Sequence, residues 1–139
     1  MTTREYLQRP ETLRLEIRRK RARISTLRRL SNRLSSVFSD VKVKSSPDHT
    51  RMQTFLAEAA DEEQEIARLT EERKQAMTDA SLLISRLPDE RMARILEMRY
   101  LDRLSWEEIT DRLNGGSSTV YRLHQQALDL LSPPDDSPD

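Results

Sequence analysis

Four polar side chains in the C-terminal part of the sequence recur at the spacing of one helical face. At about 100° per residue, this face consists of Ser118, Tyr121, Arg122 and Gln125. A guanidinium such as that of Arg122 can bond a guanine edge in two places or bond a phosphate, and an amide such as that of Gln125 can bond adenine. The pattern therefore indicates the chemistry of reading base edges in the major groove of DNA.

Three hydroxyl side chains open the same stretch: Ser117, Ser118 and Thr119. Backbone N–H groups at the start of a helix have no partner within the helix, and they carry the positive end of the helix dipole. Hydroxyls and N–H groups in such a position bind phosphate. We therefore expect these three residues to contact the DNA backbone beside the base-reading face.

A short helix is expected just before this stretch, beginning at Ser105. Ser105 is a favourable N-cap, and Glu108, three residues later, can reach back to the Ser105 backbone to form a capping box. Leu104 and Ile109 occupy the two positions of a hydrophobic staple. These signals predict a helix that ends near Leu113.

A tight turn and a second helix follow. Asn114-Gly115-Gly116 tolerates the positive φ that is common just beyond a helix end, and Ser117 or Ser118 is expected to cap the next helix. The apolar side of that helix comprises Val120, Leu123, Ala127, Leu130 and Leu131. Two helices joined by so short a turn form the helix-turn-helix of DNA-binding proteins.

Two long helices are expected before this unit. The first should begin at Pro10, after a weak turn from Thr3, because proline suits a first helical turn. Its apolar residues recur at steps of three and four or their multiples. They are Leu13, Ile17, Ile24, Leu27, Leu34 and Phe38. The second should begin with Ser46 as N-cap and continue to about Leu87. Two long helices joined by a short loop should pack antiparallel as a coiled-coil-like hairpin.

The predicted fold class is therefore all-α, with a long antiparallel helical hairpin followed by a C-terminal helix-turn-helix domain. The hairpin takes residues 1–87 with a loop over 39–46, the helix-turn-helix domain takes residues 88–132 with a leading helix from Asp89 to about Leu101, and the tail takes residues 133–139. The tail holds three prolines and three aspartates, so we expect it to be disordered.

The zero net charge of the chain hides an asymmetry. Residues 1–51 carry a net charge of +9, and residues 52–79 carry a net charge of −5. A basic stripe at helical spacing on the first helix comprises Arg14, Arg18, Arg21 and Arg28. This stripe either contacts DNA phosphates or pairs with carboxylates across the hairpin. Those carboxylates are Asp61, Glu62, Glu63 and Glu65.

Several short motifs between residues 87 and 131 form one pattern. They are Leu87-Pro88, Arg99-Tyr100-Leu101, the run LSWEEI over 104–109, Ser118-Thr119-Val120 and Leu123-His124. In these motifs the segment resembles region 4 of bacterial sigma-70-type factors, which implies a helix-turn-helix that reads promoter DNA. With a charged hairpin in front of it, the chain is similar to small phage regulators of the RinA/ArpU-like late-gene activator type. That resemblance implies a phage-encoded promoter-binding regulator.

The charge of the helix-turn-helix domain limits its expected affinity for DNA. Residues 88–132 contain six arginines and eight carboxylates, and neutralisation of phosphates dominates nonspecific binding. Arg112 adds one expected phosphate contact. We therefore expect binding to need a homodimer or another homo-oligomer, the basic stripe, or the host RNA polymerase as a second partner.

Other functions find little support in the sequence. Trp106 is expected to pack between helices rather than to stack on a base. His124 is expected to be a boundary residue at the edge of the apolar face rather than a pH switch or a ligand. The adjacent carboxylates Glu107 and Glu108 are explained by helix capping and solvation rather than by catalysis. We therefore expect no enzyme activity. With no cysteine and two distant histidines, no metal site and no cofactor are expected. No apolar run exceeds three residues, so we expect no membrane partner and a cytoplasmic location in a bacterial host cell.

The function predicted from these observations is sequence-specific binding of double-stranded promoter DNA in transcriptional regulation. The second helix of the helix-turn-helix should enter the major groove. Two alternatives stay open. One is a phage DNA-packaging protein similar to a small terminase subunit, and the other is an adaptor that binds RNA polymerase without touching DNA.

Overall fold

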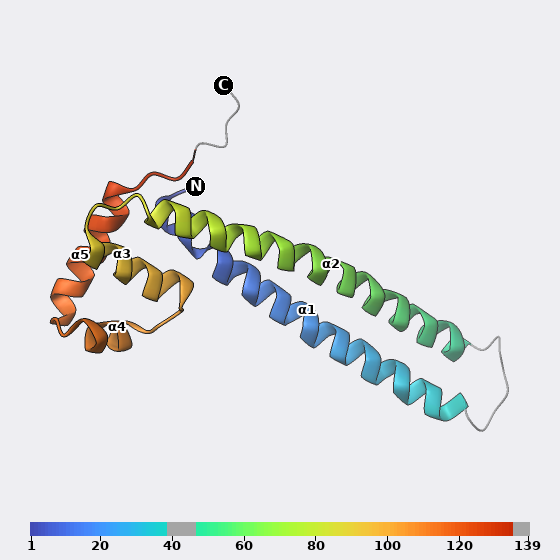
Figure 1. Ribbon diagram of the computed structural model, residues 1–139. Coiled ribbons are helices and arrows are strands. Elements are labelled where there is room, and N and C mark those ends of the chain that lie inside the picture. Colours follow the sequence, from blue (N-terminus) through green and yellow to red (C-terminus); the bar gives the residue numbers. More distant parts are fainter. Residues whose placement is uncertain (39–46, 135–139) are drawn as a thin grey trace. The chain divides into compact units, whose positions relative to one another are not determined.

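The computed structural model describes residues 1–38 and 47–134, and their regular structure is entirely helical (Figure 1). The helices are α1 (Thr3–Phe38), α2 (Pro47–Ile84), α3 (Glu90–Leu96), the π-helical segment η1 (Glu97–Leu101), α4 (Trp106–Leu113) and α5 (Ser117–Leu130). The described ranges contain no strand, so the predicted all-α class is confirmed. The expected loop over 39–46, its Ser46 N-cap and residues 135–139 of the expected tail lie outside the described residues.

Contacts divide the chain into two compact units. One contains residues 1–12 and 72–139, and we call it the terminal unit. The other contains residues 13–71, and we call it the central unit. This division differs from the boundary expected at residue 87. The first turns of α1 and the last turns of α2 belong to the same unit as α3, α4 and α5.

The first helix begins earlier than expected. The Glu5 N–H donates to Thr2 Oγ1 (3.0 Å), and the Thr2 N–H donates to Glu5 Oε2 (3.3 Å), which forms a capping box. Pro10 therefore lies inside α1, and the prediction that it starts the helix is wrong. Its missing N–H leaves one helical hydrogen bond unmade, but the cap and the burial of Leu7 hold the preceding turns in the helix.

The second helix ends and the third begins around a proline. α2 ends at Ile84 rather than near Leu87, and the Leu87 N–H donates to the Ile84 carbonyl in a tighter turn (3.0 Å). Asp89 then caps α3, because its Oδ1 accepts from the N–H groups of Arg91 (2.8 Å) and Met92 (3.2 Å). A helix start at this point agrees with the sequence-based expectation.

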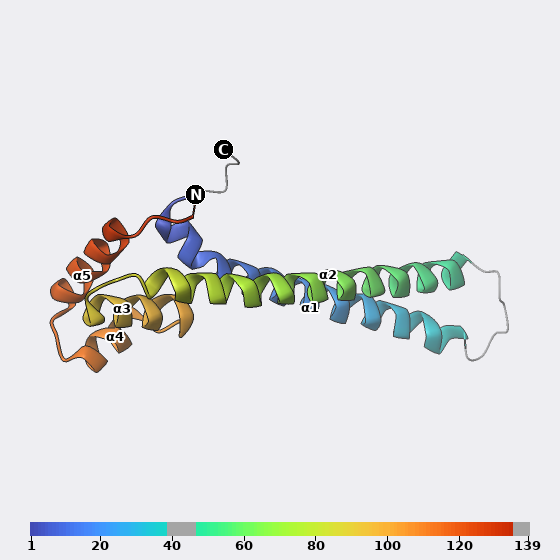
Figure 2. The same cartoon turned by 45° about the horizontal axis from the view of Figure 1, so that its top comes forward.

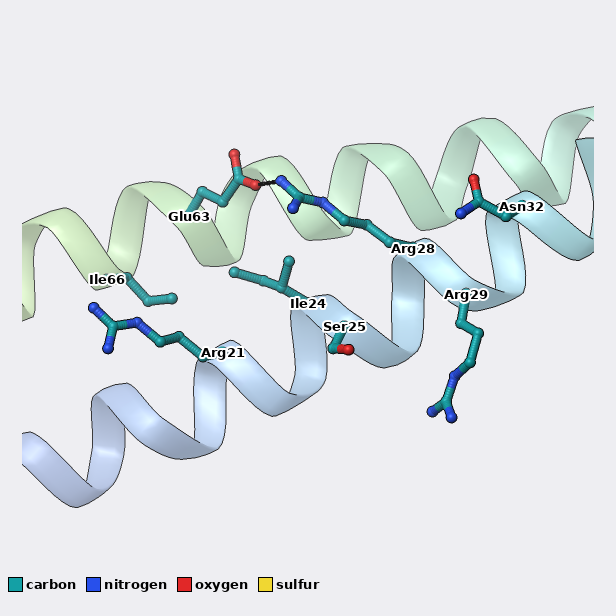
Figure 3. A pocket seen from close by; sticks show the side chains of 8 residues that line it. All are labelled: Arg21, Ile24, Ser25, Arg28, Arg29, Asn32, Glu63 and Ile66. Atoms are coloured by element: carbon teal, nitrogen blue, oxygen red, sulfur yellow. Dashed lines mark hydrogen bonds and ion pairs between the residues drawn. The ribbon is translucent and has the colours of Figure 1, made fainter.

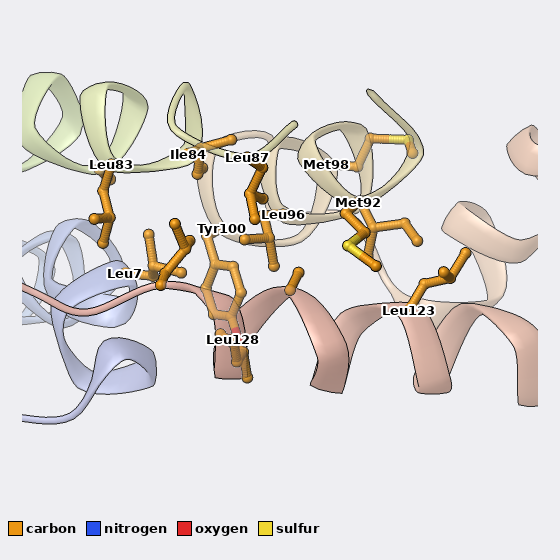
Figure 4. Close-up of a cluster of buried hydrophobic side chains, with 14 of the residues drawn as sticks. Leu7, Leu83, Ile84, Leu87, Met92, Leu96, Met98, Tyr100, Leu123 and Leu128 are labelled. Atoms are coloured by element: carbon orange, nitrogen blue, oxygen red, sulfur yellow. The ribbon is translucent and has the colours of Figure 1, made fainter. Parts of the chain in front are cut away.

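The terminal unit has one hydrophobic core, to which all five α-helices contribute (Figure 4). Leu7 of α1, Ile84 of α2 and Ile95 of α3 are at most 1% exposed. Ile109 of α4 and Ala127 of α5 have no exposed surface. Since these side chains face inward, the core fixes which sides of α4 and α5 remain open to solvent.

In the central unit α1 and α2 lie side by side, as both views show (Figures 1 and 2). Lys20 contacts Glu62 and Arg23 contacts Glu58, so the two helices run in opposite directions here. Four seam positions are buried as expected: Leu13, Ile17, Ile24 and Leu27. The closed hairpin itself stays a prediction, since the connecting residues are not among those described.

Candidate nucleic-acid interface

The start of α4 is fixed by its cap and its staple. The Glu108 N–H donates to Ser105 Oγ (3.1 Å), which confirms Ser105 as the N-cap. The Glu108 carboxylate accepts from the Ser105 hydroxyl (3.1 Å) rather than from the Ser105 backbone, so the capping box differs in this bond from the one expected. Ile109 is fully buried, and Leu104 packs against the same core. The staple predicted from the sequence is therefore in place.

The turn between α4 and α5 depends on its asparagine. Asn114 has φ 52° and ψ 26°, in the left-handed region, while neither glycine has a positive φ. Gly116 is the N-cap of α5, with φ −68° and ψ 152°. The prediction that Ser117 or Ser118 caps this helix is thus wrong, because both residues already lie inside it. A glycine cap has no side chain to accept from the first N–H groups: the Thr119 N–H donates to the Gly116 carbonyl (3.1 Å), and the N–H groups of Ser117 and Ser118 have no side-chain cap.

The two sides of α5 are sharply different. Its inner side buries Val120, Leu123, His124, Ala127 and Leu128. Its outer side exposes Ser118, Tyr121, Arg122 and Gln125, while Thr119 is half-buried. Leu130, expected on the inner side, is 61% exposed, because the helix ends there and the extended Leu131 enters the core instead. The four predicted base-reading side chains therefore share one exposed face.

Two residues of this face already have partners. The Tyr121 ring lies 4.9 Å from the Trp106 ring, between centroids. The Gln125 amide donates to Asp129 Oδ1 (3.0 Å). Arg122 makes no ion pair or side-chain hydrogen bond with any residue of the described ranges. Of Tyr121, Arg122 and Gln125, Arg122 is consequently the side chain most available to an outside ligand.

A cluster of aromatic rings and arginines packs behind this face. The Arg99 guanidinium lies 4.6 Å from the centroid of the Trp106 ring, and the His124 ring meets Trp106 edge-on at 4.7 Å. Trp106 therefore packs between helices, as expected. His124 is only 5% exposed and bonds the Tyr100 hydroxyl through Nε2 (2.8 Å). Burial, with the positive charges of Arg4 and Arg99, lowers the pKa of the His124 imidazole to about 4.

The sequence analysis did not identify Arg4 or Arg99 as functional residues. Arg99 occurs in the Arg99-Tyr100-Leu101 motif, but nothing local indicates that its guanidinium stacks on Trp106 seven residues later. Arg4 lies in a segment that the sequence patterns treated as a weak turn. The Thr-x-x-Glu spacing of Thr2 and Glu5 was the available signal that this segment is helical.

The central unit shows how far the basic stripe is neutralised. Arg28 pairs with Glu63, and Lys20 pairs with Glu62 (3.1 Å). Arg18 and Arg21 are exposed and form no ion pair with the described residues. The stripe is therefore only partly paired across the two helices. Arg14 is half-buried on the same helix, and Arg112 is exposed in the last turn of α4.

Glu65 was expected to pair across the hairpin, and that expectation is wrong. It pairs instead with Arg68, three residues later on α2 (2.7 Å). The hydrogen bond from Arg68 and its charge lower the pKa of the Glu65 carboxyl. The short i,i+3 reach along a single helix favours this partner over one on another helix.

A shallow groove of about 620 Å³ lies on the central unit (Figure 3). Ile24 and Ile66 provide its apolar part, and Arg21 and Arg28 approach it from α1. Arg28 points to Glu63 across the groove. Arginines and apolar side chains are thus combined on one surface of the central unit.

Neither a metal cluster nor a membrane span is found in the described part of the chain. Residues 1–38 and 47–134 hold no group of three His, Asp or Glu side chains placed to bind a metal ion. None of their helices combines the length and the hydropathy that crossing a bilayer requires.

The fold and the exposed face of α5 define an all-helical protein with a compact pair of short helices at its C-terminal side. The chain belongs to the family described as "Protein of unknown function (DUF1492)", whose model matches residues 29–132. The match includes α2 through α5, but it begins after the last residue of the basic stripe on α1 and so leaves out the whole stripe. No curated protein matches the chain, and no solved structure does.

Proposed function

We propose that this protein is a sequence-specific DNA-binding transcriptional regulator, in which α4 and α5 act as a helix-turn-helix. In this proposal α5 enters the major groove of promoter DNA. The observation that carries the proposal is that α5 has one buried apolar side and one exposed polar side. It buries Val120 and Leu123 and exposes Arg122 without a partner in the described residues. The resemblance to sigma region 4 and to RinA/ArpU-like activators supports a promoter as the target and a phage as the source.

The residues of α5 would divide between base and backbone contacts. Arg122 is suited to a guanine edge, because its guanidinium is exposed and unpaired. Ser117 and Ser118, in the first turn after a glycine cap, are suited to a phosphate. Gln125 would first have to release Asp129, so its contribution to specificity should be smaller than that of Arg122.

Self-association would raise the affinity of a domain with net charge −2 over residues 88–132. In the central unit Leu15 is 43% exposed and Leu56 is 47% exposed. A second copy that covers these side chains would bring two α5 helices to one DNA site. We therefore propose a homodimer as the DNA-binding form, and host RNA polymerase as a further partner.

The proposal is tested by gel shift with the DNA upstream of the protein's own operon. Arg122→Ala should lower specific affinity about tenfold or more, because a bidentate base contact is worth about 1–3 kcal/mol. Arg91→Ala is the matched control, since Arg91 is an exposed arginine of α3. Equal affinity of both variants and the parent protein would contradict the assignment of α5 to the groove.

One alternative function, an adaptor that binds RNA polymerase, is supported by a separate observation. The exposed side of α4 carries Glu107, Glu108 and Asp111, and Asp129 lies near Gln125 on α5. Such an acidic surface also suits an adaptor that binds RNA polymerase without DNA. Retention on immobilised polymerase, together with no shift of any DNA at low salt, would favour the adaptor. A large ring-shaped oligomer would instead favour a packaging protein.

A further inference from the structure

A second polar pocket lies in the terminal unit, beside the outer face of α5. It has a volume of about 350 Å³. Its lining includes Arg4 of α1 and Arg99 of η1, together with Tyr121 and Gln125 of α5. No carboxylate of the described residues is part of its lining. The pocket thus gathers two guanidinium groups without an internal counter-charge.

Arg99 is held in place before any ligand arrives. Its Nη1 donates to the Leu104 carbonyl (3.0 Å), and its guanidinium stacks on Trp106. A guanidinium has five N–H donors, so this anchoring leaves others for a ligand. Because the side chain is half-buried and fixed, little conformational entropy is lost when it binds.

Arg4 supplies the second charge from a different helix. Its side chain is exposed, and its charge acts on both Tyr100 and His124. Glu11, one of the acidic residues of the same helical segment, contacts Arg103 (3.9 Å) and does not line this pocket. Two like charges near one cavity repel each other, and an anion between them relieves that repulsion.

We propose that this pocket binds a phosphate group. Guanidinium N–H groups match phosphate oxygens in geometry and charge. The Tyr121 hydroxyl and the Gln125 amide can supply further donors from α5. The volume exceeds that of phosphate alone and falls in the range of about 300–1,000 Å³ that is typical of small-ligand sites. The group is either a phosphodiester of bound DNA, which rests on the function proposed above, or the phosphate of a free phosphorylated molecule, which does not.

Trp106 provides a direct test, because it lines the pocket and is the only tryptophan of the chain. Inorganic phosphate is titrated into the full chain at constant ionic strength, with chloride as the reference, and Trp106 fluorescence is recorded. We expect a saturable change, and Arg4→Gln should weaken phosphate binding by about fivefold or more. Arg91→Gln should leave it unchanged.

Two further titrations distinguish the sources of the phosphate. If Arg4→Gln also weakens the binding of duplex DNA, the group is a phosphodiester. If Arg4→Gln weakens only inorganic phosphate and adenosine monophosphate, it belongs to a free ligand, and this result holds even if the protein never binds DNA. The inference is overturned if phosphate acts no differently from chloride, or if Arg4→Gln binds phosphate as tightly as the parent protein.

Discussion

The phenol oxygen of Tyr100 lies 2.8 Å from Nε2 of His124, and this hydrogen bond joins η1 to α5 inside the terminal unit. Tyr100 is 8% exposed and His124 is 5% exposed. A buried polar group without a partner costs about 1–3 kcal/mol. The hydrogen bond between Tyr100 and His124 avoids this cost for the phenol oxygen and for Nε2. The bond lies behind the exposed face of α5 and helps to fix the orientation of that helix.

The first prediction concerns pH. The folded protein holds the pKa of His124 at about 4, whereas its ordinary value is 6.5. Between these values the unfolded state binds more protons, so the free energy of unfolding falls as the pH falls. From about pH 7 to about pH 5, His124 should account for a loss of about 2 kcal/mol. Urea unfolding at both pH values measures this loss. The loss should be smaller in His124→Gln, and an equal loss would assign the pH dependence to other groups.

The second prediction concerns the hydroxyl of Tyr100. Tyr100→Phe keeps the ring but leaves Nε2 of His124 buried without its partner, so the free energy of unfolding should fall by about 1–2 kcal/mol. Tyr121→Phe is the matched control, because Tyr121 is 48% exposed and should lose little. Both are compared by denaturant unfolding followed through Trp106 fluorescence. Similar stabilities of the two variants would argue against the importance of the buried bond.

The third prediction concerns the turn before α5. Asn114→Ala should cost about 1 kcal/mol, because a residue with φ 52° is strained when its side chain cannot bond locally. Gly115→Ala should be neutral or slightly stabilising. A Cβ there would meet no heavy atom within 4 Å beyond its neighbours in the chain, and the φ of Gly115 is not positive. In thermal unfolding, Asn114→Ala should therefore have a lower Tm than Gly115→Ala. Glycine is usually the turn residue that tolerates substitution least, so this order is the reverse of the usual one.

The fourth prediction concerns the first helix. Leu7→Ala should destabilise the terminal unit by about 2–5 kcal/mol, because Leu7 is fully buried in its core. Leu82→Ala, at a residue of the same unit that is 61% exposed, should cost about 0.5 kcal/mol or less. Trp106 fluorescence reports on this unit, so it separates the effect from changes in the central unit. A small effect of Leu7→Ala would mean that the N-terminal turns are dispensable for the core.

Local signals predicted much of α4 and α5. The Ser105 cap, the staple of Leu104 and Ile109, and the outward face containing Arg122 all follow from residues within one or two turns of each other. Errors arose where a distant partner decided the outcome. α1 continues in front of Pro10 partly because Leu7 is buried against later helices, which the nearby sequence does not indicate, and partly because Thr2 and Glu5 form a capping box, which their spacing does indicate.

The candidate phosphate pocket was beyond sequence reasoning for the same reason. Its two arginines are separated by more than half of the chain, and they meet only because α1 packs with the C-terminal helices in one unit. No periodicity or spacing relates Arg4 to Arg99. Residues brought together by tertiary packing can be found only once that packing is known.

The bond from Thr3 Oγ1 to the Leu131 carbonyl (2.8 Å) has a consequence for the order of folding during synthesis. The terminal unit is assembled from the first turns of the chain and from its last helix. Leu7 leaves the ribosome early, but its core neighbours on α5 are made more than a hundred residues later. The nascent chain must therefore keep the Leu7 segment unpacked until α5 has been made, which makes this segment a natural point for chaperone binding or aggregation.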